Sequence, residues 1–135
     1  MANAPHFLLA TRHAWLDRIT TDLSTSCIFN IYAGVQPADT SAATTAANVV
    51  VAAPTFPATN AFAAAASSAI AANTITSDTS AVGGTAAWFS ITKSTGLRVI
   101  DGSVGTSGAD LNLNSLTITT GSTVAIAAFT VTSAA

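Results

Sequence analysis

Residues 85–114 constrain the fold of this chain more than any other stretch of the sequence. They contain three runs in which apolar and polar residues alternate, with turns at 93–96 and 105–108 between them. Alternation with a period of two places successive side chains on opposite faces of a strand. Short turns that contain glycine join neighbouring strands, and Gly96 is expected to supply the positive φ that the first turn needs. The stretch therefore predicts three strands of a β-sheet.

Further runs with strand character lie on both sides of this stretch, at 27–32, 48–53, 115–119 and 123–132. The last of these runs is apolar on both faces, which is typical of an interior strand. Residues 61–72 are ambiguous, because their alanines favour a helix whereas two serines and the threonine-rich run that follows favour a strand. We interpret residues 69–76 as a strand with very small side chains. Short strands at this spacing predict an antiparallel sandwich.

One helix is expected near the N-terminus, over residues 5–24, because apolar residues recur there at helical spacing on one face. These apolar residues are Leu8, Trp15, Leu16, Ile19 and Leu23. The helix also carries Arg12 and Arg18, and it either covers an open end of the sheet or docks on a neighbouring molecule. The sequence thus predicts a mainly β single domain over 1–135, in which this helix precedes an antiparallel β-sandwich of jelly-roll or immunoglobulin-like type at 26–135.

Charged residues are scarce in this chain. They make up 7% of it, with a net charge of −2, against about 25% in an average soluble domain. Small neutral side chains suit close contact with copies of the chain or with a scaffold, which favours an assembly protein over a soluble monomer coated in threonine, serine and asparagine. Four Lys and Arg residues form no basic patch, so nucleic acid is not an expected partner. No signal peptide or membrane-spanning run is evident, so neither secretion nor a membrane is expected.

The run D-L-N-L-N at 110–114 matches the first half of a calcium-binding loop. The match fails further on, because Ser115 stands where such a loop has glycine and Gly121 stands where it has glutamate. Strict alternation explains the run better, with two leucines inward and a ladder of polar side chains outward. We therefore expect no metal site here.

The other side chains that could take part in catalysis or bind a metal are isolated in the sequence. His13 and Asp17 lie one helical turn apart and are interpreted as a surface pair, since no G-x-S-x-G nucleophile motif accompanies them. Cys27 is the single cysteine and lies in an apolar run, which favours a small buried hydrophobe over a reactive thiol. The sequence therefore predicts no catalytic residues, no cofactor and no metal, and an enzyme is the weakest functional reading.

Four pieces of the sequence form a series: Leu16-Asp17, I-Y-A-G-V-Q-P at 31–37, Trp88-Phe89, and D-G-S-V-G-T-S-G-A-D-L-N-L-N at 101–114. The series resembles small proteins encoded in the structural-gene regions of tailed bacteriophages and prophages. The resemblance covers most of the chain, and its last piece is the most specific. Ser90 departs from it, because a bulkier or basic residue is expected there. The resemblance implies a virion component whose role in the family is poorly defined.

Within a virion, the size, the low charge and the small-residue faces favour a capsid-decorating (cement) protein. It would form a homotrimer and bind the phage major capsid protein or another virion protein, in particles assembled in the cytoplasm of the host bacterium. The expected interface residues are Trp15, Arg12, Arg18, Trp88 and Tyr32, with the two tryptophans as anchors.

Two other functions remain open at this point. The chain could be a tail or head-fibre adaptor or spike module of the virion, which differs from a cement protein only in its place in the particle. It could instead be a carbohydrate-binding or adhesin module that uses Trp88, Tyr32 and the asparagine ladder.

Overall fold

The computed structural model of the chain describes residues 8–133, which form one helix and nine short strands. The elements are α1 (Leu9–Asp22), β1 (Ile28–Tyr32), β2 (Val50–Ala52), β3 (Ala69–Ala71), β4 (Gly84–Thr85), β5 (Trp88–Thr92), β6 (Arg98–Gly105), β7 (Leu111–Asn112), β8 (Thr117–Ile118) and β9 (Thr130–Thr132). The prediction of a mainly β protein with one N-terminal helix is confirmed. The expected helical residues 5–7 lie outside the described residues.

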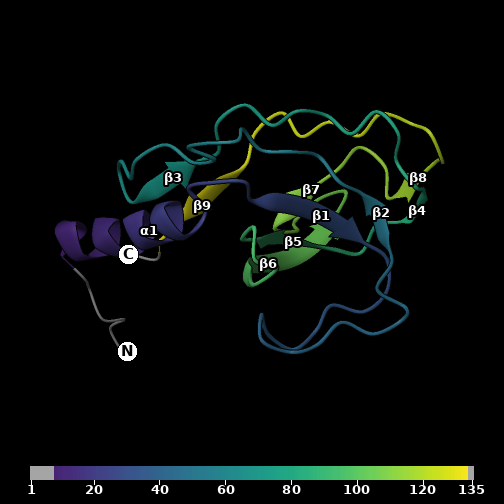
Figure 1. Cartoon of the computed structure of the whole chain (residues 1–135), viewed down its shortest axis with the longest axis horizontal. Coiled ribbons are helices and arrows are strands. Elements are labelled where there is room, and N and C mark those ends of the chain that lie inside the picture. Colours follow the sequence, from purple (N-terminus) through teal and green to yellow (C-terminus); the bar gives the residue numbers. More distant parts are fainter. Residues whose placement is uncertain (1–7, 134–135) are drawn as a thin grey trace.

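A curled five-stranded sheet in the order β2-β1-β5-β6-β7 forms the centre of the molecule. Its pairs are antiparallel except for β6 and β7, which run parallel. Two smaller antiparallel pairs, β3-β9 and β4-β8, complete the sandwich-like arrangement. Figure 1 shows α1 and the β3-β9 pair at one end of the molecule and the β4-β8 pair at the other.

The core lies on one face of this sheet and is built from five phenylalanines. Phe29 stacks on Phe89 with ring centroids 5.3 Å apart, and the edge of Phe129 meets both rings at 5.6 and 5.4 Å. Phe56 and Phe62 extend the cluster. All five side chains are buried, because alternation along β1 and β5 directs Phe29 and Phe89 to the same side of the sheet.

Helix α1 docks through Leu16 and through Leu23, which immediately follows it, and both are buried. The expected surface pair of His13 and Asp17 is wrong. His13 Nε2 instead accepts the backbone N–H of Ser68 at 3.2 Å, and Asp17 Oδ1 accepts that of Ala65 at 3.1 Å. Both polar side chains therefore hold the helix to the alanine-rich segment.

The ambiguous residues 61–72 form no helix. A tight turn at Ser67 and Ser68, with φ of 49° and 64°, leads into the short strand β3. Two positive φ values in succession are the geometry of a type I′ hairpin turn. Tertiary pairing with β9 overrides the helical propensity of alanine here. The strand ends at Ala71, well before the expected residue 76.

The prediction of an interior strand over residues 123–132 is wrong. Only its last three residues form a strand, β9, which pairs with β3 alone. Val124 and Ile126 are buried. Ala125, which lies between them, and Ala127, which follows them, are exposed. An alanine counts as apolar in a sequence pattern, yet its small side chain gains little from burial and is tolerated at the surface.

Candidate interaction surfaces

Trp88 is not the exposed anchor that its outward-facing position in β5 suggests. Its side chain is fully buried. The ring stacks on Tyr32 from β1 at a centroid distance of 4.3 Å and an interplanar angle of 10°, and the guanidinium of Arg98 lies 5.6 Å from its centroid. The expectation of Trp88 as an interface anchor is therefore wrong. For the same reason it presents no ring face on which a sugar could stack.

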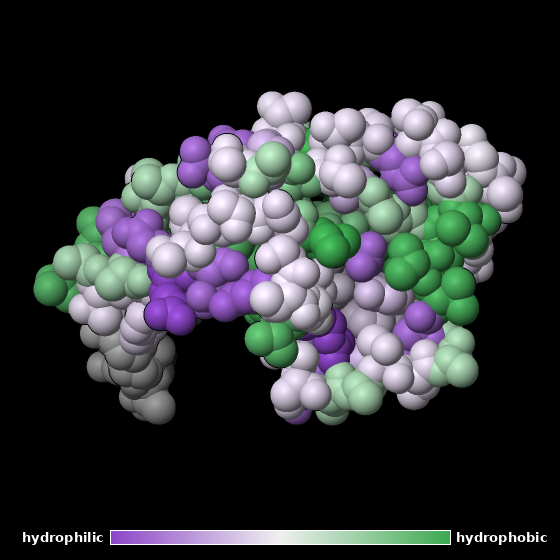
Figure 2. Space-filling model, in the orientation of Figure 1, coloured by the Kyte–Doolittle hydropathy of each residue, from purple (hydrophilic) through white to green (hydrophobic). Residues whose placement is uncertain are grey.

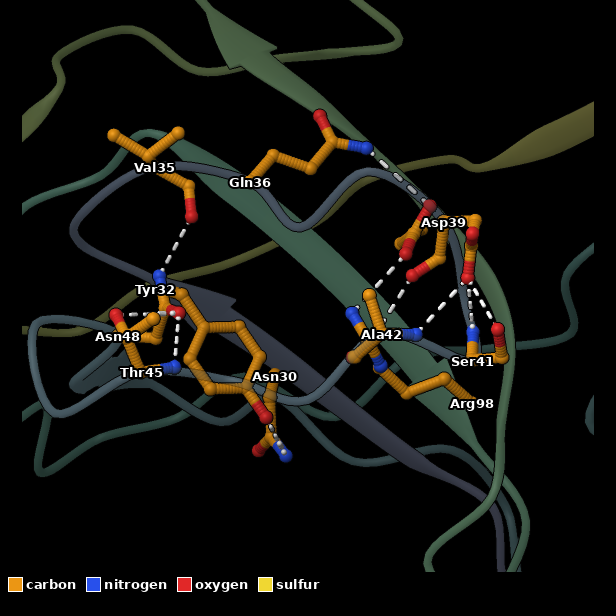
Figure 3. Close-up of polar contacts among 11 residues, drawn as sticks. Asn30, Tyr32, Val35, Gln36, Asp39, Ser41, Ala42, Thr45, Asn48 and Arg98 are labelled. Atoms are coloured by element: carbon orange, nitrogen blue, oxygen red, sulfur yellow. Dashed lines mark hydrogen bonds and ion pairs between the residues drawn. The ribbon is translucent and has the colours of Figure 1, made fainter.

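Arg98 ties the loop at 34–47 to the sheet. Its side chain is only 8% exposed and forms an ion pair with Asp101 at 3.2 Å. It also donates to two loop carbonyls, that of Asp39 at 3.1 Å and that of Ala42, and Figure 3 shows these contacts converging on the arginine. Gln36 adds a bond from the loop to Asp101 at 3.3 Å. The loop is thereby fixed over the face of the sheet that carries Trp88.

Side chains within the loop fix its shape. The carboxylate of Asp39 accepts the N–H groups of Ser41 and Ala42 at 2.8 and 2.9 Å. The hydroxyl of Ser41 donates to the same carboxylate oxygen, and this bond above all, together with the two N–H bonds, lowers the pKa of Asp39 below its ordinary value. Asn48 donates to the carbonyl of Val35 at 2.8 Å and accepts the N–H of Thr45 at 2.8 Å (Figure 3). Each polar side chain replaces a hydrogen bond that regular secondary structure would supply.

Gly34, at the start of the loop, should not tolerate a side chain. Its φ is +84°, and a Cβ there would lie 2.6 Å from the carbonyl oxygen of Ala47. Gly96 has a similar φ of +88° with nothing within 4 Å, so Gly96→Ala is a matched control for backbone strain alone. We expect Gly34→Ala to lower the free energy of unfolding by about 1–3 kcal/mol more than Gly96→Ala does. Chemical denaturation of both variants measures the difference. Equal losses of unfolding free energy would contradict the close approach of the Ala47 carbonyl to residue 34.

The other expected interface residues are divided between two parts of the molecule. Tyr32 is partly buried against Trp88 in the central sheet, whereas Arg12, Trp15 and Arg18 lie on α1. Trp15 is half-exposed, and the side chain of Arg18 is 74% exposed and paired with Asp22 at 3.1 Å. The five residues therefore do not form one surface.

A cluster of exposed valines, which sequence reasoning missed, lies at the end of the central sheet far from α1. Val35 is 85% exposed, Val49 is 51% exposed and Val82 is 60% exposed. Backbone bonds bring their segments together, because Ala33 donates to the carbonyl of Val49 and Gly83 to that of Val51. We call Val35, Val49 and Val82 the valine patch, and Figure 2 shows hydrophobic residues gathered at this end of the molecule. Val35 and Val49 lie in the connection between β1 and β2, and Val82 lies shortly before β4, so no single sequence pattern contains all three.

Polar side chains elsewhere form hydrogen bonds within the structure. Asp110, the first residue of the calcium-like run, accepts the N–H and the hydroxyl of Ser103, both at 2.8 Å, and these bonds lower its pKa. Among residues 8–133, no group of three His, Cys, Asp or Glu side chains is placed to hold a metal ion. Burial raises the pKa of the Cys27 thiol to about 11, so the thiolate is scarce at neutral pH.

Comparisons of this chain with protein-family models, with curated proteins and with solved structures find no match. No helix in the described part of the chain is long and apolar enough to cross a membrane. The features that bear on function are therefore the chain's own: a loop fixed by Arg98, an apolar patch at one end, and a surface with few charges.

Proposed function

We propose that this chain is a non-catalytic structural protein of a bacteriophage virion, where it decorates and stabilises the assembled head. Its partners would be copies of itself, as a homotrimer, and the phage major capsid protein. The motif series that ends at residues 101–114 supports the virion assignment. The valine patch carries the docking part of the proposal, because three exposed valines at one end of a chain with 7% charged residues form a surface suited to burial.

The mechanism of stabilisation is thermodynamic. A protein that binds the assembled shell but not the separated subunits shifts the equilibrium towards the shell by mass action. At a free concentration 100 times the dissociation constant, each site contributes about 2.7 kcal/mol. Apolar area buried by the valine patch would supply part of the affinity, at roughly 25 cal/mol per Å². No catalytic group is needed for this role.

The test compares particles assembled with and without this chain. We expect particles that lack it to lose their DNA at lower temperature and under milder osmotic shock, and added wild-type protein to restore their resistance. Val82→Asp should fail to restore it, whereas Leu97→Asp, at an exposed residue outside the valine patch, should succeed. Equal resistance of particles with and without the chain would refute the cement role. Label found on the tail in electron micrographs would favour the adaptor alternative.

A further inference from the structure

Backbone hydrogen bonds join the segment that precedes β9 to the rest of the molecule only at its two ends. Val124 exchanges both backbone hydrogen bonds with Asp78, at 2.7 and 3.0 Å, and the carbonyl of Phe129 accepts the N–H of Ala72 at 2.8 Å. Among residues 8–133, the backbone groups of residues 125–128 have no hydrogen-bond partner. Figure 1 shows this segment, in yellow, running along one rim of the molecule. We call residues 125–128 the free edge.

The free edge is anchored by buried side chains and exposed at its alanines. Val124 and Ile126 are buried in the core, while the alanines at 125, 127 and 128 are exposed. The buried side chains anchor the segment to the core, while the exposed alanines leave it open to solvent. A strand with unpaired N–H and C=O groups is a template for pairing with another strand.

A shallow groove lies beside the free edge. Its wall opposite the free edge is formed by residues 111–114, and its volume is about 360 Å³. A neighbouring hollow of about 280 Å³, lined by residues 113–115, 117–118 and 122–125, continues it. Every side chain that lines the two is uncharged. An approaching segment with charged side chains would lose hydration here without meeting an opposite charge.

The free edge also lacks the usual protection against pairing. Exposed edges in natural proteins commonly carry lysine, proline or an inward-pointing charge. The free edge reads Ala-Ile-Ala-Ala, and its small exposed side chains would let a second backbone approach to the normal strand spacing of about 4.8 Å.

We propose that the free edge pairs antiparallel with the free edge of a second copy of this chain, across a two-fold axis. The second copy fits because its free edge is uncharged, small in its exposed side chains and equally unpaired, and because a two-fold axis brings the same segment to both sides of the contact. The contact goes beyond the proposed cement role and does not depend on it. In a shell of trimers, it would join one trimer to the next.

The first test measures self-association of the purified chain by sedimentation and light scattering over a range of concentrations. Ala127→Lys places two like charges beside the paired edges, and we expect it to raise the dissociation constant of the contact about tenfold or more. Ala64→Lys makes the same change at an exposed alanine outside the free edge and should leave the constant unchanged. If the wild-type chain shows no dimerisation through this contact up to millimolar concentration, the proposal is overturned.

Hydrogen exchange locates the contact independently of any variant. The amides of residues 125–128 should exchange freely at low concentration and become protected as the chain associates. Association that leaves these amides unprotected, or that Ala64→Lys weakens as much as Ala127→Lys does, would also overturn the proposal. Because both measurements use the isolated chain, their failure would leave the result of the particle-stability test untouched.

Discussion

Replacing Phe29 with alanine should lower the free energy of unfolding by about 3–5 kcal/mol. Phe29 is fully buried where Phe56, Phe89 and Phe129 meet, with ring centroids between 5.3 and 5.7 Å from its own. Removing the ring leaves a cavity at the centre of the cluster, and neighbours held by the sheet can only partly fill it. Urea denaturation, followed by tryptophan fluorescence and circular dichroism, measures the loss.

The control for this variant is Val35→Ala, which also shortens an apolar side chain but at an 85% exposed position. Its free energy of unfolding should change by about 0.5 kcal/mol or less. A loss below about 1 kcal/mol for Phe29→Ala would show that the five phenylalanines do not pack as a common core.

Replacing Arg98 with alanine should also lower the free energy of unfolding by about 3–5 kcal/mol. The variant leaves the nearly buried carboxylate of Asp101 without its counter-charge and removes two hydrogen bonds to the loop. It also removes the cation above Trp88. Because the arginine ties the loop down, amides at 35–46 should exchange faster with solvent than in the wild type.

Arg18→Ala is the matched control, because Arg18 forms an ion pair with Asp22 but is 74% exposed. A solvated pair at this helical spacing is worth about 0.3–0.5 kcal/mol. The loss of unfolding free energy in Arg98→Lys should lie between the losses in Arg98→Ala and Arg18→Ala. Lysine keeps the positive charge but lacks the planar guanidinium that reaches several acceptors. An Arg98→Ala variant as stable as Arg18→Ala would contradict the role of Arg98 in holding the loop.

Alternation predicted the central sheet well. Residues 85–114 contain β5, β6 and β7, and the turn at 93–96 closes with the expected positive φ at Gly96 and a 2.9 Å bond from Lys93 to Leu97. Side-chain direction along β5 was also predictable, because successive residues of a strand must face opposite ways. The parallel pairing of β6 with β7 was not predictable, since strand order depends on contacts between distant residues.

The candidate surfaces were predicted poorly, for reasons that differ between residues. Trp88 does face away from the phenylalanine core, but the pattern within β5 cannot show that Arg98 and Tyr32 cover it. The valine patch combines residues of the β1–β2 connection with Val82, which precedes β4, so no short window of sequence contains it. The free edge could not be predicted because alanine counts as apolar in a hydrophobic pattern, so the run was interpreted as a buried strand.

The sequence by itself determined that this chain builds a β-rich core with one helix before it, because periodicity and glycine turns act over a few neighbouring residues. It also determined the scarcity of charge that makes an uncharged edge and an apolar patch possible. Only the tertiary structure decided which outward-facing groups stay accessible. Accessibility depends on which distant residues cover each group. Tyr32 and Arg98 cover Trp88, while nothing in the described chain pairs with the backbone of 125–128.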